Sequence, residues 1–336
     1  EAGNDPATSA HCLLKCDLMG ARIVSELISL SSADPADEIV YTQVVAVSDI
    51  SEVLTASVNM YEVRHSTTSG VTELVKAETL PESDGVVAVS HVRFFENDYL
   101  MTVSHYSHEL DSYSLPSVLY VLEHNTPGSL RTWTQVQGYL TYGATDMTSF
   151  RIDEEVFVAI ANYYNGSSHS IQSDIVRMSI TDAHGRFSQV PLLTSNQSIS
   201  TVGARAVAHF RLASSANTQD DFIVFTSELS NTIHLLSWDR DAAQFVAVHD
   251  LQHPRPTSLV VVTTSSDTTV IAVASTQHDL TVFTVLAGQG AHQLVQRQRV
   301  ATGPLDHLRL MSLRMHVGDT ATVALQDVKC VATLLY

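Results

Sequence analysis

A short motif of histidine, an apolar residue and arginine recurs along the chain and carries side chains suited to binding an anion. The copies are His91-Val-Arg93, Ser149-Phe-Arg151 (with serine first), His209-Phe-Arg211 and His307-Leu-Arg309. Residues two apart on a strand point to the same face. The motif therefore predicts either a repeated cationic row that attracts an anion, or buried polar groups that pair between neighbouring units. Repetition favours pairing, because a ligand site rarely needs every copy.

A second cluster with possible chemistry is SHYSHELDSY, residues 104–113, which could offer metal ligands. Its candidate ligands are His105, His108, Glu109 and Asp111. The two inner histidines stand where a strand gives way to a loop, without the helical frame that fixes zinc ligands on one face. We interpret the stretch as a solvated loop and predict no metal site.

Further catalytic signatures are missing from the sequence. The acidic turns 31–38 and 152–155 lack the spaced oxygens of a calcium loop. The chain has no Gly-x-Ser-x-Gly elbow and no phosphate-binding glycine loop. We therefore expect no catalytic residue and no cofactor, and predict that the chain is not an enzyme. A propeller hydrolase with metal ligands scattered over several units is the less favoured alternative.

The elements that carry the motif form an internal repeat. The stretches 85–107, 143–166 and 203–229 align with one another at intervals of roughly 50–60 residues, and 302–327 aligns with them more weakly. Each of five units holds four short strand-like segments, which in the third unit are 145–152, 155–163, 173–180 and 186–193. These segments are rich in β-branched residues and are separated by Asp, Asn, Gly, Ser and Pro.

This repeat predicts an all-β fold, a β-propeller of six four-stranded blades, with seven possible. The predicted blades are 22–80, 85–140, 143–193, 203–251, 257–300, and 303–336 together with 11–19. The N-terminal strand would complete the last blade and so remove the unpaired edges at the seam. We expect a single domain over residues 1–336.

Composition narrows the classes of partner. The chain has 336 residues, 44% of them hydrophobic and 16% charged, and a net charge of −18. This balance fits a folded protein and disfavours binding to nucleic acid or to an anionic membrane. No apolar run is long enough to span a bilayer, so no membrane insertion is expected.

Cysteines and glycosylation sequons point to an oxidising compartment. Cys12, Cys16 and Cys330 are the three cysteines, and a bridge from Cys330 to Cys12 or Cys16 would lock the predicted ring closure. The alternative is three free thiols in a reducing compartment. Asn165 and Asn196 begin Asn-x-Ser sequons and are candidate glycosylation sites.

The stretch GATDMTSFRIDEEVFVAIANYYNG, residues 143–166, resembles the EAR (epitempin, EPTP) repeat. The matching positions are Gly143, Ala144, Phe150, 156–160, Ala161 and Asn162. Proteins with this repeat, such as the leucine-rich glioma-inactivated proteins, are secreted or cell-surface propellers of seven blades. The resemblance implies a non-enzymatic role in ligand binding or adhesion.

The sequence thus predicts a secreted or cell-surface module for protein–protein interaction or adhesion, within an extracellular assembly. Its expected partners are extracellular proteins. A carbohydrate-binding, lectin-like propeller is the alternative, because tyrosines on loops could stack on sugars. These tyrosines are Tyr106, Tyr113, Tyr163 and Tyr164.

Overall fold

The structure is a computed structural model. It describes residues 27–30, 42–49, 57–65, 72–81, 83, 85–95, 97–107, 109–123, 132–181, 187–213, 219–263, 269–277, 279–287 and 292–301. This part of the chain holds no helix that is long and apolar enough to cross a lipid bilayer. The last predicted blade and its N-terminal strand lie outside the described residues, as do Cys12, Cys16, Cys330, His307 and Arg309.

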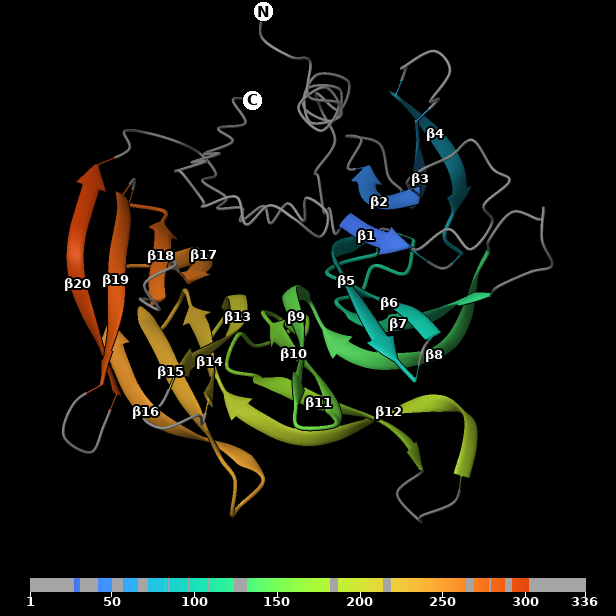
Figure 1. Cartoon of the computed structure of the whole chain (residues 1–336). Coiled ribbons are helices and arrows are strands. Elements are labelled where there is room, and N and C mark those ends of the chain that lie inside the picture. Colours follow the sequence, from blue (N-terminus) through green and yellow to red (C-terminus); the bar gives the residue numbers. More distant parts are fainter. Residues whose placement is uncertain are drawn as a thin grey trace, which may run out of the picture. The chain divides into compact units, whose positions relative to one another are not determined.

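The described strands form five sheets of four strands each, and every sheet follows the order of the sequence (Figure 1). The first sheet consists of β1 (Leu27–Leu30), β2 (Thr42–Asp49), β3 (Ser57–His65) and β4 (Thr72–Thr79). The second consists of β5 (Val86–Phe94), β6 (Asn97–Ser104), β7 (Ser114–Glu123) and β8 (Thr132–Tyr142).

The remaining three sheets have the same up-and-down order. The third consists of β9 (Ala144–Ile152), β10 (Glu155–Asn162), β11 (Gln172–Thr181) and β12 (Phe187–Ser200). The fourth consists of β13 (Ala204–Ala213), β14 (Gln219–Ser227), β15 (Thr232–Asp239) and β16 (Gln244–Gln252). The fifth consists of β17 (Pro256–Thr263), β18 (Thr269–Ser275), β19 (Asp279–Ala287) and β20 (His292–Ala301).

Each sheet is the four-stranded antiparallel meander of a propeller blade. The predicted all-β class is therefore confirmed, and the predicted strands agree with the described ones to within a few residues in most places. β12 is the main exception, because it continues to Ser200 where the sequence predicts an end at 193. The number of blades and the closure by the N-terminal strand stay predictions.

Burial explains why the strands of one sheet differ in sequence. The second strand lies between two neighbours and is buried on both faces, so β10 reads as the nearly unbroken apolar run EVFVAIAN. The fourth strand lies at a sheet edge, and β16 accordingly buries Phe245 within the mixed run QFVAVHDLQ. The same contrast separates β6 from β8.

The chain divides into two compact units, Glu1–Ala144 with Ile180–Leu193, and Thr145–Ser179 with Thr194–Tyr336. In the first unit, one core cluster joins the β1–β4 and β5–β8 sheets through Met60, Leu100, Tyr120 and Trp133. In the second unit, two core clusters lie between successive sheets. One contains Phe157 and Phe225, and the other contains Phe222 and Phe283.

Candidate functional site

The three described copies of the His-x-Arg motif lie on the first strands of their sheets, β5, β9 and β13. On β13, the Nε2 atom of His209 lies 2.9 Å from Oδ1 of Asp221, and Nε of Arg211 donates to the same oxygen at 2.8 Å. Asp221 stands opposite Arg211 in the β13–β14 ladder and is 4% exposed. The histidine and the arginine therefore share one buried carboxylate within their own sheet.

The other described copies follow the same plan in part. His91 on β5 lies 2.8 Å from Asp98, the residue opposite Arg93 in the β5–β6 ladder. On β9, Arg151 is half-exposed and lies 4.0 Å from Glu154. Its carbonyl accepts a hydrogen bond from Arg211, which connects the third and fourth sheets.

Burial sets the protonation of the His209 pair. Desolvation lowers the pKa of His209 below its ordinary value of 6.5, although the hydrogen bond and charge of Asp221 act in the opposite direction. The imidazole stacks on the ring of Phe150 with centroids 4.4 Å apart. Among the described residues, these contacts give the motif local structural partners. A role in binding an anion stays untested.

Two of the candidate metal ligands in residues 104–113 make hydrogen bonds with other groups. His105 Nδ1 lies 2.9 Å from the carbonyl of Gly143, and Asp111 accepts a hydrogen bond from the hydroxyl of Tyr106. Across the described part of the chain, no group of three or more His, Cys, Asp or Glu side chains is arranged to hold a metal ion. His108 lies outside that part.

A repeated backbone feature positions a different set of side chains. The residue before the first strand of a sheet has a positive φ at Gly85, Gly143, Gly203 and Arg255. At Gly85, Gly203 and Arg255 the carbonyl of this residue accepts a hydrogen bond from the first residue after the second strand, as in Glu228 N–H to Gly203 at 2.9 Å. The start of each of these three first strands is thereby fixed beside the loop between the second and third strands.

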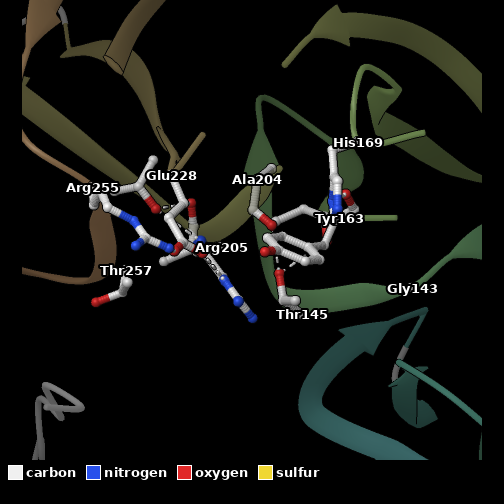
Figure 2. Close-up of polar contacts among 12 residues, drawn as sticks. Gly143, Thr145, Tyr163, His169, Ala204, Arg205, Glu228, Arg255 and Thr257 are labelled. Carbon is white, nitrogen blue, oxygen red and sulfur yellow. Dashed lines mark hydrogen bonds and ion pairs between the residues drawn. The ribbon is translucent and has the colours of Figure 1, made fainter. Parts of the chain in front are cut away.

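Two arginines converge on one glutamate at this end of the second unit. Nε of Arg205 donates to Oε2 of Glu228 at 2.7 Å, and Nη2 of Arg255 donates to Oε1 at 2.5 Å. The guanidinium of Arg205 also lies over the ring of Tyr163, 3.8 Å from its centroid. Figure 2 shows Arg255, Glu228 and Arg205 in a row, with Tyr163 beyond them. We call these four residues the arginine-pair site.

Three sheets contribute to the arginine-pair site. Arg205 is the second residue of β13 and Glu228 follows β14, so both belong to the fourth sheet. Tyr163 follows β10 in the third sheet, and Arg255 precedes β17 in the fifth. Thr145 Oγ1 donates to the carbonyl of Ala204 at 2.8 Å and links the third sheet to the start of β13.

Charge and burial at the site favour an ionised glutamate and exposed cations. Burial raises the pKa of Glu228, but hydrogen bonds and charge from Arg205 and then Arg255 outweigh it, so the pKa lies below its ordinary value of 4.5. The Glu228 side chain is 2% exposed, whereas those of Arg205 and Arg255 are 33% and 51% exposed. Two cations against one anion leave a local charge of +1.

The tyrosine of the site keeps its proton. Burial raises the pKa of Tyr163 above its ordinary value of 10.0, while the charge of Arg205 opposes this and that of Glu228 adds to it. The ring also packs edge-on against His169, with centroids 4.8 Å apart. A neutral phenol beside two guanidinium groups is a hydrogen-bonding group that adds no negative charge.

This arrangement suits recognition of a carboxylate. A guanidinium presents five N–H donors in a planar fork that matches a carboxylate in a bidentate manner. The hydrogen bonds to Glu228 use Nε of Arg205 and Nη2 of Arg255. Among the described residues, only Nη2 of the Arg255 guanidinium makes a hydrogen bond, and the Arg255 side chain is half-exposed.

Sequence reasoning missed this site, although a signal was present. The four aligned strand starts carry Val87, Thr145, Arg205 and Thr257 at the same position. Arg205 is thus the only charged residue among these four. Two positions earlier, Arg255 stands where the other three sheets have a glycine. An internal repeat is recognised by the positions that its copies share, whereas this site consists of residues at which the copies differ.

The glycosylation candidates lie at different depths. Asn165 is partly exposed in the loop between β10 and β11, and its Oδ1 accepts hydrogen bonds from the N–H groups of Ser167 and Ser168. Asn196 is exposed within β12. Both asparagines stay predictions as glycan acceptors.

No protein-family model matches the chain, and no curated protein matches it. The structure is similar to the periplasmic gluconolactonase of Pseudomonas aeruginosa, with 15% identity, coverage of 78% of this chain and 68% of that chain, and a TM-score of 0.47. It is also similar to Sqt1 from Chaetomium thermophilum, with 11% identity, coverage of 80% of this chain and 59% of that chain, and a TM-score of 0.48. A third similar structure is the exo-β-1,3-galactanase of Phanerochaete chrysosporium, with 10% identity, coverage of 68% of this chain and 51% of that chain, and a TM-score of 0.41.

Enzymes therefore stand among the similar structures. This finding contradicts the prediction that the chain is not an enzyme, and we withdraw that prediction. Identities and TM-scores of this size assign no reaction to the chain.

Proposed function

We propose that the chain is an interaction module that binds an acidic segment of a partner protein at the arginine-pair site. The observation that carries this proposal is the fixation of two partly exposed arginines by one buried glutamate. An arginine that is already held in place loses less side-chain entropy when it binds a ligand. The site therefore presents a preorganised cationic surface to a carboxylate.

Because the chain is strongly negative overall, an acidic ligand is attracted to the arginine-pair site only at short range. The chain as a whole carries −18 and repels an acidic ligand at a distance. Charges separated by more than a Debye length, about 8 Å at physiological salt, are largely screened. Affinity must therefore come from direct contact with Arg205 and Arg255, and the surrounding negative charge would disfavour acidic ligands elsewhere on the surface.

We also propose that the partner is extracellular and that the chain is secreted or displayed at the cell surface. The two sequons, one of them at the exposed Asn196, and the cysteines near both ends of the sequence support this setting. The same proposal includes a closed β-propeller of six blades, with seven blades as the alternative. It also includes membership of the chain in the EAR-repeat family. Support for the ring comes from the five blade-like sheets and the strand-like segments predicted on either side of them.

A titration with two peptides tests the binding proposal. The probe is a short acetylated peptide of alternating glutamate and glycine, and its control has glutamine in place of glutamate. We expect the glutamate peptide to bind and the glutamine peptide to bind much more weakly. The Arg205→Gln and Arg255→Gln variants should each lose roughly 10-fold to 100-fold in affinity, as expected when a charge-assisted hydrogen bond is removed.

Arg240→Gln is the matched control variant. Arg240 is 55% exposed and pairs with Asp153 at the surface of the same unit, away from Glu228. Its loss should leave peptide affinity unchanged. Equal binding of both peptides, or full binding by the Arg205→Gln/Arg255→Gln double variant with an unchanged melting temperature, would show that the site does not bind acidic segments.

A further inference from the structure

Two consecutive sheets carry the same set of aromatic side chains in the loop between their second and third strands. The first triad consists of His105, Tyr106 and Tyr113, between β6 and β7. The second triad consists of Tyr163, Tyr164 and His169, between β10 and β11. Each triad thus contains one histidine and two tyrosines, and all six side chains are partly exposed.

Backbone hydrogen bonds place the two triads at equivalent positions of the repeat. His105 and Tyr163 each directly follow the second strand of their sheet. At the other end of the triads, the carbonyl of Tyr113 accepts the N–H of Gly143 at 2.6 Å, and that of His169 accepts the N–H of Gly203 at 2.8 Å. The first and third members are therefore fixed by the same architecture in both sheets.

Within each triad the third ring contacts the other two. In the first triad, Tyr113 lies edge-on to His105 with centroids 5.5 Å apart and tilted against Tyr106 at 4.6 Å. In the second, His169 lies edge-on to Tyr163 at 4.8 Å and stacks on Tyr164 at 4.4 Å. The histidine and tyrosine have exchanged places between the triads, yet the set of three rings is the same.

The fold itself does not require these rings. The corresponding loop of the fourth sheet has Glu228 and Leu229 in the first two positions, and the N–H of Arg255, before the next first strand, donates to Oδ1 of Asn231. The fifth sheet has Thr276 and Gln277 in the first two positions. Since two of these four sheets form without the triad, a shared packing need does not explain it.

Polar groups adjoin the rings in both loops. The hydroxyl of Tyr106 donates to Asp111, and that of Tyr164 donates to the carbonyl of Gly166 at 2.7 Å. Asn165 and Ser167 lie in the second loop beside Tyr164. Each loop thus combines apolar ring faces with oxygen and nitrogen atoms at their edges, the combination that amphipathic aromatic side chains bring to partly wet sites.

We propose that each triad is a binding site for carbohydrate. A sugar ring offers an apolar face of C–H groups that can stack on a tyrosine or histidine, and hydroxyl groups that exchange hydrogen bonds with carboxylate, amide and phenol groups. The proposal concerns each loop by itself. The first triad shares no residue with the arginine-pair site, whereas the second shares Tyr163, on whose ring the guanidinium of Arg205 lies.

A proline-rich peptide is the competing ligand for exposed tyrosines, and the ring geometry disfavours it. A polyproline II helix has three residues per turn and a rise of about 3.1 Å per residue, so its contacts repeat at roughly 9 Å. The rings of each triad lie within 5.5 Å of the central one, edge-on in two of the four contacts and tilted by 46° in a third. A compact group the size of one or two sugar rings fits this spacing better.

The test uses the full chain from a bacterial host, so that no glycan on Asn165 covers the second triad. A printed array of neutral and acidic glycans is probed first. Methyl glycosides of galactose, mannose and N-acetylglucosamine are then titrated while the tyrosine ring signals are followed by NMR. We expect selective array binding, and shifts in the signals of Tyr106, Tyr113 and Tyr164.

Variants separate the two triads and test the stacking. Tyr106→Ala should weaken binding at the first triad and Tyr164→Ala at the second, each by roughly tenfold. The Phe variants of both tyrosines should retain most of the affinity, since they keep the ring. Phe95→Ala, which removes a 66% exposed ring from the turn at the opposite end of β5 and β6, should have no effect.

Three outcomes would overturn the proposal. They are a blank array with unshifted tyrosine signals, glycan binding that survives the Tyr106→Ala/Tyr164→Ala double variant, and saturable binding of a proline-rich peptide that this variant abolishes. The glutamate-peptide titration gives a separate result, because Tyr106 and Tyr164 are not part of the arginine-pair site.

Discussion

The side-chain amide of Gln197 satisfies both backbone groups of Phe245 in the next sheet. Its Nε2 donates to the carbonyl at 2.7 Å, and its Oε1 accepts the N–H at 2.8 Å. In the first unit, Gln137 makes the same pair of bonds to the backbone of Leu193, at 3.3 and 2.7 Å. A glutamine on the fourth strand thus connects successive sheets, and in each case it does so beside a buried apolar side chain.

Gln197→Ala should destabilise the second unit by about 1–3 kcal/mol, because the N–H and carbonyl of Phe245 lose their partner. Denaturant unfolding followed by tryptophan fluorescence measures this change, since Trp238 packs on Phe245. Gln244→Ala is the matched control, because Gln244 is exposed on the same strand as Phe245. Equal effects of the two substitutions would contradict the proposed role of Gln197.

These glutamines also show which feature of the fold could not be predicted from the sequence. The run Thr194-Ser-Asn-Gln197 has the composition of a loop, so the sequence predicts that the strand ends at 193. β12 continues to Ser200 because Gln197 is used by the neighbouring sheet, a contact that no local pattern reveals. The four-strand units could be predicted because alternation and turn residues are local signals.

The His-x-Arg motif illustrates the same limit. Its repetition predicted paired structural groups, and the pairing was expected between neighbouring units. In the fourth sheet the shared partner is Asp221, which belongs to the same sheet, and Arg211 also donates a hydrogen bond to the neighbouring sheet, at the carbonyl of Arg151. The choice between these partners depends on the register that places Asp221 opposite Arg211. Five residues separate the two strands, and the sequence alone does not fix how the strands pair across them.

Gly203→Ala should destabilise the chain and disturb the arginine-pair site. Gly203 has φ +62°, and an added Cβ would lie 3.0 Å from Leu229 and 3.1 Å from Tyr163. Strain at this φ costs about 1–2 kcal/mol, and crowding adds about 1–3 kcal/mol. Gly166→Ala isolates the strain, because φ is +93° there and nothing lies within 4 Å of the added atom.

Thermal melting compares the two glycine variants. We expect the Gly203→Ala variant to have the lower melting temperature and the weaker affinity for the glutamate peptide. A larger loss in the Gly166→Ala variant would show that contacts of Gly203 with Leu229 and Tyr163 do not matter.

Acid should remove the contribution of Glu228 to stability. Its pKa is lower in the folded chain than its ordinary value of 4.5, so the stabilisation is present above pH 4.5 and is lost as the pH falls through the folded pKa. Glu228→Gln should cost about 1–3 kcal/mol at neutral pH, and the gap to the unmodified chain should shrink on acidification below that value. Melting temperatures across the acid range measure the gap.

The control for this pH dependence is Glu155→Gln. Glu155 pairs with Arg177 at 3.0 Å, but both side chains are about half-exposed, so little stability is at stake. A constant gap between the Glu228→Gln variant and the unmodified chain at all pH values would contradict the lowered pKa.

His209 should make stability depend on pH in a higher range. Its pKa is lowered in the folded chain, so the unfolded chain takes up the proton first and stability falls as the pH decreases below 6.5. His209→Gln retains a hydrogen-bond donor toward Asp221 without titrating. We expect its melting temperature to change less between about pH 5 and pH 7 than that of the unmodified chain.

His253 should contribute to the same slope, because burial also lowers its pKa. The His209→Gln/His253→Gln double variant should therefore have a flatter pH profile than either single variant. If neither substitution changed the slope, protonation of these histidines would not be coupled to unfolding.

Arg255→Gly should separate binding from stability. Arg255 has φ +40° where three other sheets have a glycine at the corresponding place, so the substitution relieves strain of about 1–2 kcal/mol. It also removes the bond from a half-exposed arginine to Glu228, while Glu228 keeps Arg205. A pair with one partner this exposed is worth about 0–1 kcal/mol, so the melting temperature should stay equal or rise.

Peptide binding by the same variant should fall by roughly tenfold or more, because the fork of Arg255 is gone. The expected combination, an unchanged or raised melting temperature with weakened binding of the glutamate peptide, would indicate that a strained arginine is kept at this strand start for recognition. A variant that melts lower and binds as well as the unmodified chain would instead assign Arg255 to the support of Glu228 and the sheet. In that case Arg205, whose guanidinium lies over Tyr163, would be the cation left to recognise an acidic segment.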